Sequence, residues 1–225
     1  MCETFDHIME HASRRLAEMD YLGAEALCEQ GVALARANGD WRGYARALLP
    51  LQECRRQRRM TAADTAVQLG TNACLAHPPG GPRDGCVAVT EPQTRADAAR
   101  LDDEARDAGR CVVVLWCEPG EDTWRVATHS GPRVHTDVSP PPSEAQRRRL
   151  TPDDGDGDAH AAAVHWFIAA SEALGDAALA AVAAPLGSID RVTQLEAMLA
   201  AVGDHEILHQ RLADAARALA EQAAA

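Results

Sequence analysis

Two histidines and a glutamate near the carboxyl terminus have the spacing of a zinc-binding helix. They are His205, Glu206 and His209, in the segment HEILH. Histidines four residues apart lie on one face of a helix and can share a metal ion, and the glutamate between them can polarise a water bound to that metal. This spacing makes a zinc-dependent hydrolase one hypothesis for the chain.

The residues around this motif favour a structural interpretation instead. Gly203-Asp204 combines a helix stop with an N-cap, so we expect His205 to begin a helix and not to lie within one. Where an extended zinc motif needs glycine and histidine, the chain has Leu212 and Ala215. His205 also shares a helical stripe with Leu208, Leu212 and Ala215, which suits a packing role.

We therefore predict no catalytic residue, no cofactor-binding residue and no metal ligand. His205, Glu206 and His209 remain the alternative set, and an upstream third ligand such as His160 or His165 would restore the zinc hypothesis.

Three aspartates resemble the start of a calcium-binding loop. Asp154, Asp156 and Asp158 alternate as such a loop requires. Ala159 stands where the loop needs glycine, and His165 stands where it needs a bidentate glutamate. We interpret this segment as a linker that ends in an N-cap.

The charge and the basic residues exclude several classes of protein. The net charge of −12 disfavours a nucleic-acid partner. All 22 basic residues are arginine, so the lysine of a P-loop, of a Schiff base or of a protein kinase is absent. The arginine clusters at 55–59 and 147–149 are interpreted as solvated helix ends.

The cysteine pattern and the hydropathy predict a cytoplasmic protein. Seven cysteines, an odd number with no C-x-x-C spacing, indicate reduced and mostly buried thiols. Cys111 and Cys117 share one strand parity among apolar neighbours, so we expect core thiols there and not ligands. The amino terminus lacks the pattern of a signal peptide, and no apolar run approaches eighteen residues, so no membrane span is expected.

Helices are predicted for residues 5–58. Apolar residues recur there at steps of three and four. Asp20-Tyr21 breaks the first stripe, and Asn38-Gly39-Asp40 supplies a C-cap glycine and an N-cap aspartate. Pro50 should kink or interrupt the third helix.

A change of periodicity marks a small α/β module. Cys86–Thr90 and Cys111–Cys117 are predicted strands, the second apolar on both faces and therefore central. Arg95–Ala108 is a charged helix between them. Trp124–His129 and Arg133–Val138 form a predicted hairpin. The order strand–helix–strand favours a parallel crossover for the first two strands.

The chain returns to helices after this module. Their predicted hinges are Gly175-Asp176, Leu186-Gly187-Ser188 and Gly203-Asp204, each of which pairs a glycine with a capping residue. Proline-rich linkers at 77–82 and 139–142 separate three regions. The predicted regions are N-terminal helical hairpins at 1–76, the α/β module at 84–138 and C-terminal helical hairpins at 158–225.

The helical parts resemble tetratricopeptide (TPR) repeats. Met19-Asp20-Tyr21 is similar to the Gly-Asp-Tyr turn of that repeat, and Gly203-Asp204-His205 is similar to another such turn. Ala24 and Gly31, seven residues apart, sit where the second helix of a repeat has small residues, and Trp41 would open the next repeat. The resemblance covers about 5–60 and 158–221.

The predicted fold is mainly α, with TPR-like helical hairpins flanking a small α/β module. The resemblance implies a scaffold or regulatory adaptor that binds another protein in a groove, and it carries over no catalytic residue. Either the two helical halves pack on each other, or the chain forms a homodimer. A small ligand at the carboxyl ends of the strands of the α/β module is a further hypothesis.

Overall fold

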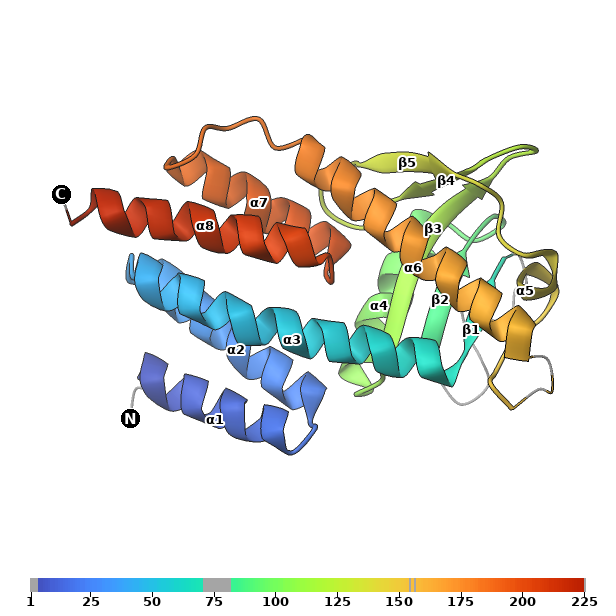
Figure 1. The fold of residues 1–225 in the computed structure, drawn as a ribbon, viewed down its shortest axis with the longest axis horizontal. Helices are drawn as coiled ribbons and strands as arrows, with labels where there is room; N and C mark the ends of the chain where they lie inside the picture. Colours follow the sequence, from blue (N-terminus) through green and yellow to red (C-terminus); the bar gives the residue numbers. More distant parts are fainter. Residues whose placement is uncertain (1–3, 71–81, 154, 156, 225) are drawn as a thin grey trace. The chain divides into compact units, whose positions relative to one another are not determined.

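The computed structural model describes residues 4–70, 82–153, 155 and 157–224. The elements in chain order are α1 (Phe5–Ala17), α2 (Tyr21–Ala37), α3 (Trp41–Thr65), β1 (Val67–Leu69), β2 (Gly85–Val89), α4 (Arg95–Asp107), β3 (Val112–Pro119), β4 (Trp124–Ala127), β5 (His135–Val138), α5 (Ser143–Arg147), α6 (Gly157–Ala180), α7 (Ile189–Val202) and α8 (Glu206–Gln222). Figure 1 shows their course. The predicted class, mainly α with a small α/β module, is confirmed.

This chain divides into two compact units. The first joins Met1–Gln57 to Leu179–Ala225, and the second is Arg58–Ala178. The first unit therefore combines segments from the two ends of the sequence.

Local capping explains where the helices of the first unit begin. Asp20 accepts a hydrogen bond from the Gly23 amide at 3.0 Å and starts α2. Asp40 does the same for α3, and Ser188 for α7. Each side-chain oxygen satisfies an amide of the first helical turn, which has no partner within the helix. The turns predicted at these positions are confirmed.

The two helical halves belong to one compact unit and pack on each other, the first of the two arrangements considered above; the homodimer stays a prediction. The hairpin α7–α8 lies beside α2 and α3 (Figure 1). Small residues allow close packing within the N-terminal half: Ala24 is fully buried, and a Cβ added to Gly31 would lie 2.7 Å from the Met9 sulfur. The largest fully buried apolar side chains of this unit are Tyr44, Leu48, Leu195, Leu208 and Leu212.

A five-stranded mixed sheet forms the centre of the second unit. Its order is β1-β2-β3-β4-β5, with β1, β2 and β3 parallel and β4 and β5 added as an antiparallel hairpin. Val89 of β2 pairs with Trp116 of β3 across the parallel ladder. The predicted order strand–helix–strand–strand–strand is present as β2-α4-β3-β4-β5, and the parallel crossover is confirmed.

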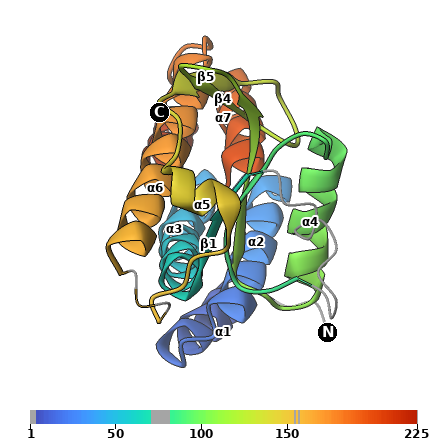
Figure 2. The ribbon, with the colours of Figure 1, turned by 90° about the vertical axis from the view of Figure 1, so that its right-hand side faces the viewer.

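Both faces of this sheet are covered. Ala98, Leu101 and Ala105 of α4 pack on the face that carries Val114 and Trp116. Helix α6 lies on the other side of the sheet (Figures 1 and 2). There Trp124 of β4 meets Trp166 of α6 edge to face, with ring centroids 5.8 Å apart. Coverage on both sides explains why β3 is apolar from Val112 to Cys117.

Three expectations need correction. The range 1–76 contains β1, which pairs with β2, a partner too distant in sequence for local periodicity to reveal. Helix α6 runs through Gly175-Asp176 without a hinge, because Gly175 is buried and tertiary packing outweighs its weak helix propensity of about 1 kcal/mol. Helix α3 continues through Pro50, so the expected interruption is wrong, while the expected kink stays a prediction.

Some predictions concern residues outside the described part of the chain. These are the linker at 77–81, the last residues of the 1–76 region, Asp154 and Asp156 of the calcium-like segment, and the thiols Cys2 and Cys74. Among the described helices, none combines the length and the apolar character that crossing a membrane requires.

Candidate functional site

The residues of the HEILH segment lie at the start of α8. His205 is the N-cap residue and Glu206 is the first residue of the helix, so His205 stands at a helix start as expected, but the N-cap predicted at Asp204 lies one residue later. His209 follows one turn later. Both imidazoles are buried, each with 1% of its surface exposed.

The hydrogen bonds of His209 fix the position of its proton. Its Nδ1 atom lies 3.0 Å from the carbonyl oxygen of His205, and its Nε2 atom lies 3.4 Å from Nη1 of Arg55. A carbonyl only accepts and a guanidinium only donates. Nδ1 therefore carries the hydrogen, and the Nε2 lone pair faces Arg55.

This environment keeps His209 neutral. Burial, and then the neighbouring Arg55 guanidinium, lower the pKa of His209 to about 3. A metal ion would have to take the Nε2 lone pair at the place where a fixed cation already stands. Among the described residues, no group of three or more His, Cys, Asp or Glu side chains has an arrangement that could hold a metal ion.

Arg55 is the centre of a buried polar cluster. Its Nε donates to Glu25 at 3.0 Å, its Nη2 to Glu29 at 2.8 Å and its Nη1 to the carbonyl of Gly203 at 2.9 Å. These bonds connect α2, α3 and the turn between α7 and α8. With His209 they form the Arg55 cluster, which links the N-terminal and C-terminal halves of the first unit.

A second polar link between the halves centres on Glu196 of α7. Its Oε1 accepts hydrogen bonds from Arg36 Nε at 3.0 Å and from the Tyr44 hydroxyl at 2.7 Å. Burial and the adjacent carboxylate raise the pKa of Tyr44, so its hydroxyl remains a donor. The Arg36 guanidinium also lies 4.8 Å from the centre of the Trp41 ring.

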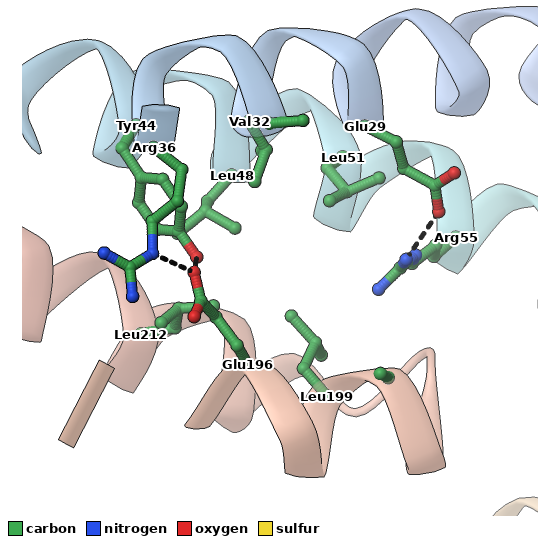
Figure 3. Close-up of a pocket in the computed structure, with 12 residues that line it drawn as sticks. Glu29, Val32, Arg36, Tyr44, Leu48, Leu51, Arg55, Glu196, Leu199 and Leu212 are labelled. Carbon is green, nitrogen blue, oxygen red and sulfur yellow. Dashed lines mark hydrogen bonds and ion pairs between the residues drawn. The ribbon is translucent and has the colours of Figure 1, made fainter. Parts of the chain in front are cut away.

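An apolar cavity of about 230 Å³ lies between these two links. Figure 3 shows the Glu29–Arg55 pair at one end and Arg36, Tyr44 and Glu196 at the other. The other residues that line the cavity are Val32, Ala33, Leu48, Leu51, Leu199, Ala200 and Leu212. Since a dry cavity of about 150 Å³ accommodates a benzene ring, this one has room for a leucine-sized or phenyl-sized group.

The cavity presents an apolar surface between two polar links, and the charged groups of these links are bonded to each other. Its walls come from α2 and α3 on one side and from α7 and α8 on the other. The exposed alanines Ala33 and Ala200 lie on opposite walls. Such a site suits an apolar side chain of a partner.

Sequence reasoning did not find this site. The sequence predicts a solvated arginine cluster at 55–59, and this is wrong for two of its members: Arg55 is 9% and Arg58 is 7% exposed. One signal was present: Glu25 and Glu29 are four residues apart and therefore lie on one face of α2, together with the buried Cys28. Charged residues on a buried face require a partner, which here is Arg55.

The other predicted candidates fall into the second unit. Cys117 is fully buried, and burial raises the pKa of its thiol, as expected for a core cysteine, whereas Cys111 is partly exposed. Helix α4 begins after the carboxyl end of β2 with a capping box. The Thr94 hydroxyl accepts a hydrogen bond from the Asp97 amide, and the Asp97 carboxylate accepts one from the Thr94 amide. The Asp97 carboxylate would repel an anionic ligand at this edge.

A scan against protein-family models, a search of curated proteins and a search of solved structures each gave no match. The resemblance to tetratricopeptide repeats therefore stays a prediction.

Proposed function

We propose that the protein is a non-enzymatic scaffold or regulatory adaptor that binds another protein through the cavity of the first unit. The observation that carries this proposal is an apolar cavity whose two walls are held by two polar links, the buried Arg55 cluster and the half-buried Glu196 link. A partner segment would place one apolar side chain between Leu51 and Leu199.

The polar groups around the cavity support binding over chemistry. Glu196 is engaged by Arg36 and Tyr44, and Arg55 is engaged by two carboxylates, so the charged atoms stabilise the walls. Fixed walls lower the entropic cost of binding, because little of the site has to become ordered when the partner arrives. The apolar floor would supply the affinity.

Exposed alanines on the cavity walls provide the test. Ala33→Arg and Ala200→Arg would each place a long charged side chain over the cavity, while Ala26→Arg puts the same group on an exposed position of α2 that does not line it. The tagged full-length variants would be used as bait in native lysate, and circular dichroism would verify their folding. We expect a stoichiometric partner whose capture falls about tenfold or more with the two cavity variants, which corresponds to about 1.4 kcal/mol, and is retained with Ala26→Arg.

Two results would contradict the proposal. The wild-type chain remains alone at physiological concentration, or every captured protein binds all three variants equally. Either outcome would remove the cavity as a partner-binding site.

The alternative, a zinc-dependent hydrolase, has the HEILH spacing as its support. The contact between His209 Nε2 and Arg55 weighs against it, since a metal would compete with a cation for the same lone pair. Metal analysis of the purified chain separates the two functions. Near-stoichiometric zinc that is lost in His205→Ala would favour the hydrolase.

A further inference from the structure

A second pair of histidines four residues apart lies in α1. His7 and His11 repeat the spacing of His205 and His209, and these are the two such pairs among the 9 histidines of the sequence. On a helix this spacing sets both imidazoles on one face, where they can share a metal ion. The expectation of no metal ligand rests on the HEILH segment, and the pair in α1 lies outside that segment.

The two imidazoles of α1 lie side by side at the surface of the first unit. Their ring centroids are 4.3 Å apart, and the ring planes are tilted by 50°. His7 is exposed and His11 is half-buried. A metal ion about 2.0 Å from one nitrogen of each ring, with a right angle between the two bonds, places the ring centroids about 4.5 Å apart. The observed spacing therefore fits two neighbouring positions around an ion of square-planar or octahedral geometry.

The rest of α1 fixes the turn that carries the pair. Ile8, Met9 and Ala12 are buried on the other side of the helix. The Thr4 hydroxyl accepts a hydrogen bond from the His7 amide at 3.4 Å and caps the first turn. Because the backbone is already ordered, only the two side chains have to become ordered when an ion binds, which lowers the entropic cost of binding.

Carboxylates engage the arginines that follow the pair. Arg14 is bonded to Glu10 at 3.4 Å and Arg15 to Asp20 at 2.7 Å. All four side chains are more than a third exposed, so water and salt screen their charges. The HEILH segment differs, because a buried guanidinium there faces the imidazole nitrogen that a metal would need. Repulsion therefore opposes a cation much less at α1 than beside His209.

We propose that His7 and His11 form a surface site for a divalent transition-metal ion of the nickel and copper class. Imidazole suits nickel, copper and zinc as a ligand, and positions at a right angle favour Ni²⁺ or Cu²⁺ over tetrahedral Zn²⁺. The two imidazole nitrogens replace two waters of the ion, and its other positions keep water. Glu10, three residues after His7 on the same face, accepts a hydrogen bond from such a water.

Isothermal titration calorimetry with Ni²⁺ tests this site on the full-length chain, prepared without a histidine tag. Nickel is the probe because thiols reduce Cu²⁺ and the chain has 7 cysteines. His7→Gln and His11→Gln each remove one ligand. His165→Gln is the matched control, because His165 is an exposed histidine of α6 with alanine four residues before and after it. Circular dichroism would verify the folding of all variants.

We expect the wild-type chain to bind one nickel ion. The affinity should fall about tenfold or more in His7→Gln and in His11→Gln, because a single imidazole loses the advantage of chelation, and it should be unchanged in His165→Gln. Saturating nickel should also raise the Tm of the wild-type chain and of His165→Gln, but not that of the other two variants, since the chelate requires the folded helix.

Three outcomes would overturn the proposal. The wild-type chain does not bind nickel, or it binds nickel as tightly as both His7→Gln and His11→Gln, which would place the ion on other groups of the chain. A ratio of one ion to two chains would mean that the ion joins two copies, and it would equally exclude a site within one helix. None of these results depends on the cavity or on a binding partner.

Discussion

Replacement of Arg55 by methionine should be among the most damaging single changes in the first unit. Methionine keeps most of the length of the side chain and removes the guanidinium. Glu25, which is 5% exposed, would lose its ion pair with Arg55 while remaining buried. Breaking a buried ion pair in this way costs about 3–5 kcal/mol.

The other contacts of Arg55 add less to this cost. The side chain of Glu29 is 40% exposed, so water replaces much of the pair that it makes with Arg55, and its contribution is about 0–1 kcal/mol. We therefore expect a loss of about 3–5 kcal/mol in the free energy of unfolding, which for a chain of this size lowers Tm by about 6–20 °C.

Urea denaturation followed by circular dichroism would measure the loss. Arg14→Met is the matched control, because Arg14 pairs with Glu10 at the surface of α1 and both side chains are more than half exposed. It should cost no more than about 0.5 kcal/mol. Glu25→Gln should be less harmful in the Arg55→Met background than alone, because it removes a charge that has lost its bond to Arg55. An Arg55→Met protein within about 1 kcal/mol of wild type would refute the role assigned to this cluster.

Three further predictions concern the same unit. The pKa of His209 is about 3 in the folded chain and about 6.5 when unfolded, so the unfolded state binds the proton first as the pH falls. The stability due to neutral His209 is fully present above about pH 6.5, and the free energy of unfolding falls by about 1.4 kcal/mol per pH unit below it. His209→Gln should therefore reduce the pH dependence of the urea midpoint between about pH 6.5 and 5, while His7→Gln, at an exposed position, should not. Equal slopes in the two variants would be inconsistent with this pKa. Gly31→Val should cost about 1–3 kcal/mol in the same assay, because its side chain would displace the Met9 sulfur, and an unchanged midpoint would exclude close packing there. Tyr44→Phe should lower the free energy of unfolding by about 1 kcal/mol, because it removes the hydrogen bond from the Tyr44 hydroxyl to Glu196. An unchanged free energy of unfolding would show that this bond does not form.

Much of the architecture could be predicted from local patterns. The glycines and capping residues around Asp20, Asp40 and Ser188 marked the helix starts because capping involves residues only a few positions apart. Short apolar runs separated by turn residues between Cys86 and Val138 identified β2 to β5 for the same reason. Where the local signal and packing disagreed, as at Gly175, packing determined the outcome.

The sequence by itself determined the helical hairpins, the order of the α/β module and the position of His205 at a helix start. The tertiary structure alone decided that Arg55 is buried, that His209 is neutral and that a cavity lies between the two helical halves. The physical reason is distance along the chain: Arg55 and His209 are 154 residues apart, and a charge can be judged solvated or buried only when its neighbours in space are known.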